Sequence, residues 1–255
     1  MTFEVPTAQL IAIMLGSVRA GAWLIICPPF NSRLIPIQIK ALLSVALALP
    51  VAPYLTSTLP SLQTSAIIAS AVLQFFVGAA LGFITYLFFA ALQAAGDLLD
   101  VFGGFTLAMA YDPLSMAQSS IFGRFYNLVA VTLLFGSNAH LIVLRGFLQS
   151  YKTLPLDAGI SMSTVSELLT QGIGEMFLAG LQIAGPLIAV LFLTDVAFGL
   201  LNRVAPALNA FQLGFPAKIL LVLTLAGTAV TILPQALNSL VEKAVTAVVQ
   251  LSAGG

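Results

Sequence analysis

Residues 66–95 read AIIASAVLQFFVGAALGFITYLFFAALQAA, a run without a single Asp, Glu, Lys or Arg. An α-helix rises 1.5 Å per residue, so about 20 apolar residues cross the roughly 30 Å hydrocarbon core of a bilayer. This run is longer than one crossing needs, which predicts a helix that is tilted or that extends beyond the membrane. The run therefore indicates a membrane-type helix.

Five further apolar runs lie on either side of it. They cover residues 8–27, 39–55, 121–148, 176–201 and 219–241. The longest connections, residues 96–120 and 149–175, are too short to hold a soluble domain. We therefore expect an all-α, integral membrane-type protein with about six long apolar helices, arranged as hairpins, several of them tilted or broken.

The composition supports this class and excludes others. Of 255 residues, 60% are hydrophobic and 7% are charged, and the mean hydropathy is +1.07. A soluble domain carries about 25% charged residues, so most of this surface should meet lipid or other subunits. Nine Lys and Arg balance nine Asp and Glu, which argues against nucleic acid as a partner. One cysteine, Cys27, and one histidine, His140, cannot build a disulfide or a metal site, so we expect neither metal nor cofactor.

Proline and glycine mark the expected ends and breaks of the helices. Pro28-Pro29 should close the first helix, and Pro36 should precede the second. Gly185-Pro186 lies inside the fifth run and predicts a kink or break there. Gly78 and Gly82 are spaced so that another helix can approach closely.

Charges near the first run bear on orientation and on burial. The distribution of Lys and Arg over the connections favours a periplasmic N-terminus, and the absence of a cationic region before the first run favours a retained first helix. Arg19 lies deep in that run. A cation there needs an acidic, carbonyl or aqueous partner, so we expect a buried polar contact at Arg19.

Residues 96–118, GDLLDVFGGFTLAMAYDPLSMAQ, form an unusually apolar connection. Gly103-Gly104 should end the preceding helix, and Asp112-Pro113 supplies a turn. The stretch between them contains no charge and is too apolar to lie in water. Either it is a connector buried against other subunits, or it blocks an opening.

Asp97 and Asp100 in the same segment are three residues apart, hence on one helix face. A catalytic pair or proton relay would need a base, a nucleophile or a metal nearby. None of the usual catalytic motifs accompanies them. We therefore expect no enzyme and no catalytic residues.

Residues 193–218, LTDVAFGLLNRVAPALNAFQLGFPAK, place polar groups between two apolar runs, where a plain membrane anchor needs none. Such groups mark contact with protein or with a water-filled path. Asp195 and Arg203 are eight residues apart, about 12 Å along a helix, so each should pair elsewhere.

Pro206 and Pro216 bracket the middle of this block and suggest a helical hairpin with Arg203 and Lys218 at its tip. The tip is either an ordinary cytoplasmic loop with anchoring positive charges or a contact in an assembly. The residues assigned to this subunit contact or hairpin tip are Asp195, Arg203, Pro206, Asn209, Phe211, Pro216 and Lys218.

Together these features resemble the FliR family, the R component of the flagellar type III export gate, over nearly the whole chain. The segment HLIVLRGFLQSYKTLP, residues 140–155, resembles flagellar members more than their injectisome counterparts. The early features are Arg19, Pro28, Pro36 and Lys40, followed by the glycine and Asp-Pro pattern of residues 104–113. The most specific match is the order and spacing of Asp195, Gly199, Arg203, Pro206, Asn209, Phe211, Pro216 and Lys218.

The resemblance implies a non-enzymatic, pore-forming subunit in the inner membrane, at the flagellar basal body. It would join several copies of the P component (FliP) and the Q component (FliQ) in a helical, multi-subunit channel. The B component (FlhB) would wrap the cytoplasmic entrance, the A component would lie nearby, and unfolded flagellar proteins would be the cargo. By the same likeness, residues 1–175 resemble the P component and residues 176–255 the Q component.

The resemblance also implies which segments close the channel and which lie at its entrance. The apolar connection would plug the closed channel, with Gly103 and Gly104 as its hinge, and the polar hairpin would lie near the entrance. The plug residues are Gly103, Gly104, Phe105, Leu107, Met109, Asp112 and Pro113. Two alternatives remain, namely the equivalent subunit of a virulence injectisome and a stand-alone secondary transporter that uses Asp195, Arg203 and Arg19 as a substrate path.

Overall fold

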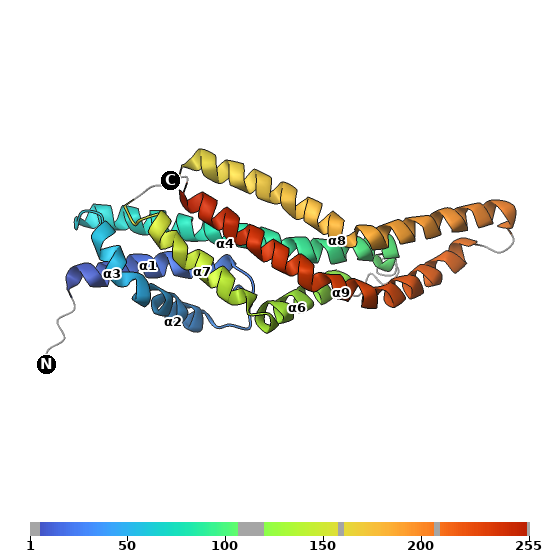
Figure 1. Ribbon diagram of the computed structural model, residues 1–255, viewed down its shortest axis with the longest axis horizontal. Coiled ribbons are helices and arrows are strands. Elements are labelled where there is room, and N and C mark those ends of the chain that lie inside the picture. The colour runs from blue at the N-terminus through green and yellow to red at the C-terminus, as the bar shows by residue number, and fades with distance from the viewer. Residues whose placement is uncertain (1–5, 107–119, 158–160, 207–209, 254–255) are drawn as a thin grey trace. The chain divides into compact units, whose positions relative to one another are not determined.

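The computed structural model describes residues 6–106, 120–157, 161–206 and 210–253, and no strand occurs among them. Five of the described helices are long and apolar enough to cross a membrane, or up to six if one bent pair counts as a span. The expected all-α, membrane-type fold is confirmed (Figure 1). In chain order the helices are α1 (Thr7–Ile26), α2 (Ile37–Ala48), η1 (Leu49–Val51), α3 (Ala52–Leu55), η2 (Thr56–Thr58), α4 (Thr64–Gly103), α6 (Ile121–Gly136), α7 (Ala139–Thr153), α8 (Met162–Val204) and α9 (Ala210–Ala253).

The first two long helices end and begin at the expected prolines. Helix α1 ends at Ile26, and the next residue, Cys27, is extended, with Pro28 after it. Helix α2 begins directly after Pro36. Both predictions are confirmed, because proline lacks an amide donor and disfavours helical backbone in the residue before it.

The run predicted over residues 121–148 is not one straight helix. Helices α6 and α7 form a pair bent by 80°. The bend lies at Asn138, whose φ of 59° is the left-handed conformation that asparagine adopts more readily than most residues. Hydropathy alone does not register such a bend, since both arms are apolar.

Of the kink or break expected at Gly185-Pro186, the break is not found, because α8 continues through Pro186 as one helix, and the kink stays a prediction. Apolar helices tolerate proline where neighbouring groups satisfy the freed carbonyl. Helix α8 also begins well before the predicted run, at Met162, so much of the connection expected over residues 149–175 is helical. Hydropathy marked the apolar part of this helix and missed its polar first turns.

The chain forms two compact units that are interleaved in sequence. The first comprises Met1–Phe88, Ser137–Ile173 and Leu240–Gly255, and the second comprises Phe89–Gly136 and Gly174–Ser239. The division expected at residue 175 rests on likeness to other proteins, so it stays a prediction.

In the first unit, α1 packs against α2, α3 and α4. A Cβ added at Gly78 of α4 would overlap the backbone of Arg19, and one at Gly82 would lie 3.1 Å from the carbonyl oxygen of Trp23. The predicted close approach at the two glycines is therefore confirmed. Trp23 is fully buried beside this crossing, where its ring stacks on Phe147 with centroids 4.4 Å apart.

In the second unit, the end of α4 is packed against both α6 and α8. Gly96 of α4 lies directly on the backbone of Phe122 and Gly123 in α6. A Cβ added at Gly180 of α8 would lie 3.2 Å from the carbonyl oxygen of Ala91. Small residues thus bring three helices together next to the end of α4.

Candidate functional site

The segment proposed from sequence as a plug begins where α4 ends. The helix ends at Gly103, and Gly104 has a φ of +83°, which confirms that the glycine pair ends the helix. A left-handed residue at this position is a common helix C-cap, and only glycine adopts it without strain. Phe105 follows, half-buried. The remaining residues of the expected plug, Leu107, Met109, Asp112 and Pro113, lie outside the described residues.

Asp100 joins the two ends of this segment. Its Oδ2 atom accepts a hydrogen bond from the Ser120 hydroxyl and another from the backbone N–H of Phe122, at 3.0 Å. The Ser120 hydroxyl also accepts from the N–H of Gly123 at 2.7 Å, so Ser120 is the N-cap of α6. The rings of Phe105 and Phe122 meet edge to face, with centroids 5.3 Å apart. The chain therefore leaves α4 and returns to it at nearly the same place.

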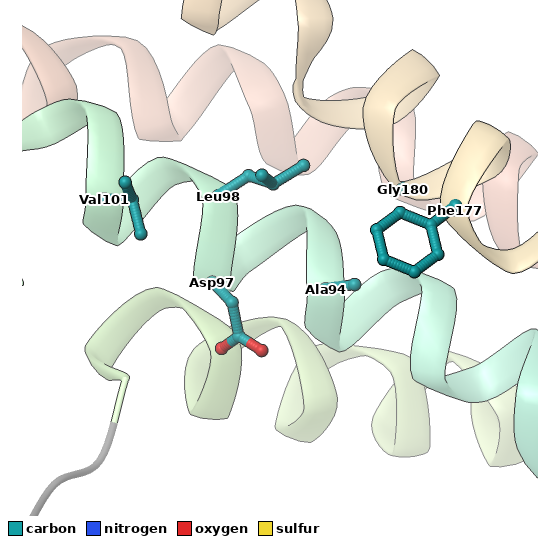
Figure 2. Close-up of a pocket in the computed structure, with 6 residues that line it drawn as sticks. All are labelled: Ala94, Asp97, Leu98, Val101, Phe177 and Gly180. Carbon is teal, nitrogen blue, oxygen red and sulfur yellow. The ribbon is translucent and has the colours of Figure 1, made fainter.

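Asp97 lies one turn earlier on the same face of α4. Figure 2 shows its carboxylate directed toward α6, where a Cβ added at Gly123 would overlap Oδ1. A negative charge in this position is favourable, because the N-terminus of a helix carries a partial positive charge. Both carboxylates thus have a structural role at the start of α6.

A cavity of about 200 Å³ lies on the other side of Asp97, between α4 and α8. Phe177, Leu98 and Val101 present apolar side chains to it, while the Asp97 carboxylate points away (Figure 2). The lining is therefore mostly apolar, with Asp97 as its charged residue.

The predicted hairpin is formed by α8 and α9, with the chain turning between Val204 and Ala210. Arg203 and Pro206 are exposed close to the turn. Phe211 lies in the first turn of α9, and Asn209 lies outside the described residues. Pro216 and Lys218 are further along α9, so Lys218 is about two turns away from the tip.

Lys218 pairs with Asp195 across the hairpin. Its ammonium group forms an ion pair with Oδ1 of Asp195 on α8, and the two side chains are 16% and 50% exposed. The expectation that Asp195 must pair with a residue other than Arg203 agrees with this geometry. The sequence signal for the pair was opposite charge on the two expected arms of one hairpin.

Arg19, in the first unit, is fully buried and bound to oxygen atoms of neutral groups. Its Nε donates to Oε1 of Gln74 at 2.6 Å, and its two terminal nitrogens donate to the carbonyl oxygens of Ser150 (3.1 Å) and Leu154 (2.9 Å). The guanidinium also lies 4.6 Å from the ring centroid of Tyr151. Arg19 thus ties α1 to α4 and to the end of α7.

Sequence reasoning missed the partners in both networks. Gln74 was a visible signal, because it interrupts the apolar run of residues 66–95 with a polar group. Ser120 was another, since a serine immediately before an apolar run is a typical helix N-cap. The backbone N–H of Phe122 has no comparable signal.

Comparison with known proteins gives one matching family model and several similar proteins, of which three are described here. The model of a family described as bacterial export proteins, family 1, matches residues 10–244. The chain is 32% identical over 217 residues to the flagellar biosynthetic protein FliR of Pectobacterium carotovorum subsp. carotovorum, covering 85% of this chain and 83% of that protein. It is 31% identical over 215 residues to FliR of Bacillus subtilis, covering 82% of each. It is also 31% identical over 148 residues to the surface presentation of antigens protein SpaR of Shigella sonnei, covering 58% of this chain and 57% of that protein.

Proposed function

The chain belongs to the bacterial export proteins, family 1, and from this premise we propose that it is a pore-forming subunit of the flagellar type III protein export gate. The observation that carries the proposal is similarity to flagellar biosynthetic proteins over most of both chains. In this role the subunit passes unfolded flagellar proteins across the inner membrane. It works by shape and packing, without catalytic residues, metal or cofactor.

Its partners in this proposal are the P, Q and B components of the gate (FliP, FliQ and FlhB), with the A component nearby. The lengths of α8 and α9 support a protein environment for part of their surface. With 43 and 44 residues they extend about 65 Å, roughly twice the hydrocarbon core of a bilayer. Leu193 on α8 and Leu220 on α9 are both 65% exposed, so lipid or neighbouring subunits must cover them.

Co-purification tests this assignment. A tag on this chain, in membranes of the native bacterium, is expected to capture the P and Q components in a detergent-stable complex. An unrelated tagged membrane protein with several helices serves as the control and should capture neither. Purification of the chain as a monomer that transports a small solute in liposomes would contradict the proposal.

Within the gate, the segment that starts at Gly103 is the plug of the closed channel. Its proposed residues are Gly103, Gly104, Phe105, Leu107, Met109, Asp112 and Pro113. Two observations support this. The segment carries no charge from Gly103 to Tyr111, and the contacts of Asp100 with Ser120 and of Phe105 with Phe122 hold its ends together. A segment anchored at both ends on one helix suits a part that moves while the helices around it stay in place.

Deletion of residues 104–111 tests the plug. The closed gate is expected to leak ions and small solutes, because the apolar obstruction is gone. The leak is measured as solute entry into cells, after confirming that the P and Q components still co-purify. Equal permeability of the deletion variant and the wild type, in assembled complexes, would contradict the plug role.

The α8–α9 hairpin is proposed as a contact for the B component near the cytoplasmic entrance. Arg203 and Pro206 support this role because both are exposed near the turn and have a neighbouring apolar surface. In the same proposal the N-terminus is periplasmic, residues 1–175 correspond to the P component, and residues 176–255 correspond to the Q component.

The two alternatives have different support. The match to SpaR favours the injectisome equivalent as a second candidate, although it covers less of the chain than the flagellar matches. The secondary transporter would use Asp195, Arg203 and Arg19 as its path and a discontinuous helix at Gly185-Pro186, and α8 is continuous at Pro186. The flagellar gate is therefore the better conclusion.

A further inference from the structure

Two features that the sequence suggested separately are in contact in the second unit. One is the glycine pair at the end of α4, and the other is the α8–α9 hairpin. A Cβ added at Gly104 would lie 3.0 Å from Cε2 of the Phe215 ring, and one at Gly103 would lie 2.9 Å from Cγ2 of Val222. Helix α9 therefore presses directly on the point from which the proposed plug starts.

Lys218 lies between these two contacts on the same face of α9, since residues 215, 218 and 222 follow the helical spacing. Its ammonium nitrogen is 3.4 Å from the carbonyl oxygen of Phe102, in the last turn of α4. The final carbonyls of a helix have no partner within the helix, and the C-terminus carries a partial negative charge. A lysine is well suited to bind there.

Asp195 determines where this lysine points. Its carboxylate on α8 forms the ion pair with Lys218, so the ammonium group is held between α8 and the end of α4. Lys218 thus links three helices, and its side chain is only 16% exposed. The plug's other end, at Ser120, is attached to Asp100 of α4.

We propose that Lys218, oriented by Asp195, is a positioning residue that holds the end of α4 against α9 and so couples the hairpin to the plug. This inference rests on the proposed function, because it takes the segment after Gly103 to be the plug. When a partner of the gate displaces α9, the contacts at Phe102, Gly103 and Gly104 are lost together. The end of the plug at Gly104 is released, while Asp100 still retains the end at Ser120.

Substitutions in the assembled gate test this coupling. Lys218→Met removes the ion pair and the contact with the Phe102 carbonyl, Asp195→Asn removes only the ion pair, and Lys218→Arg keeps a cation. The expected order of leak is Lys218→Met above Asp195→Asn, with Lys218→Arg close to wild type. Lys152→Met, at an exposed lysine of the first unit, is the matched control and should not leak.

A second measurement reports the position of the plug's start without depending on leak. Thr106→Cys, in a Cys27→Ala background, places one thiol directly after Phe105. In the purified complex, Lys218→Met is expected to raise the rate of maleimide labelling at this thiol several-fold, and Lys218→Arg should leave it unchanged. If Lys218→Met does not assemble, Asp195→Asn and Phe215→Leu provide the same comparison, since each removes a single contact.

The outcomes separate the inference from the proposed function. Wild-type leak and wild-type labelling in assembled Lys218→Met complexes would overturn the coupling. If deletion of residues 104–111 still caused a leak, the proposed plug role would stand. Faster labelling of Lys218→Met with no leak from the deletion would support the positioning role of Lys218 and overturn the plug.

Discussion

Arg19 illustrates how a charged residue is accommodated in so apolar a chain. It is fully buried, and its hydrogen bonds go to the Gln74 side chain and to the carbonyls of Ser150 and Leu154. The two carbonyls belong to the C-terminal end of α7, where a cation is favoured by the helix dipole. Arg19 therefore works as a clamp between α1, α4 and α7.

Removing this clamp should destabilise the first unit strongly. Arg19→Met removes one donor from each of three buried acceptors. The Ser150 carbonyl keeps the N–H of Leu154, and each group left unpaired costs about 1–3 kcal/mol. Arg19→Lys should lose less, because an ammonium group can still reach one acceptor. The measurement is thermal unfolding in detergent, followed by the fluorescence of Trp23, the one tryptophan of the chain.

Arg33→Met serves as the matched control for this comparison. Arg33 is exposed, so its removal should change stability by less than about 0.5 kcal/mol. An Arg19→Met protein that unfolds at the same temperature as the control would contradict the clamp.

The sequence predicted that Arg19 needs a partner and named the possible kinds. It did not reveal which partner, because the carbonyl oxygen of a residue such as Ser150 has no signature in its side chain. The partners of Asp100 show the same limit. The Ser120 hydroxyl was visible as a helix cap, whereas the N–H of Phe122 depends on how α6 is placed.

Among the helices, ends were easier to predict than lengths. Pro36 and Gly104 act on the backbone of their own or neighbouring residues, so α2 begins and α4 ends where the sequence indicated. The bend at Asn138 was missed, and whether Pro186 breaks α8 or leaves it continuous was not decided, because each depends on packing around the helix. Effects of a residue on its own backbone could be predicted from the sequence, and effects of packing between helices could not.

The crossing of α1 and α4 at Gly78 gives a prediction about helix packing. A Cβ at Gly78 would overlap the carbonyl group of Arg19, so Gly78→Ala must push the helices apart and stretch the Arg19–Gln74 bond. Overpacking of this kind costs about 1–3 kcal/mol. A lower unfolding temperature, measured by Trp23 fluorescence, is the expected result.

Gly174→Ala on α8 is the control for this substitution. No atom lies within 4 Å of a Cβ added at Gly174, so alanine should be neutral or slightly stabilising there. If both alanine variants unfold like the wild type, the helices are not held together at Gly78.

For the whole molecule, the class of protein could be predicted from the sequence, but the contacts between distant segments could not. The all-α fold and the family followed from apolar runs and from the spacing of polar residues between 193 and 218. The contact of Phe215 with Gly104 did not, because residues more than a hundred positions apart meet only once α4 and α9 are placed. The coupling proposed for Lys218 therefore became visible only in the fold.

The attachment of Ser120 to Asp100 has a consequence for how this protein can vary. Ser120 and Phe122 are bonded to Asp100, so the two ends of the intervening segment lie close together on α4, and its length is not set by the distance between helices. The entropy of closing a flexible loop grows slowly, by about 0.6 kcal/mol for each doubling of its length. Insertions and deletions between the two anchors should therefore change the free energy of folding little, and the length of this segment can vary without remodelling the helices.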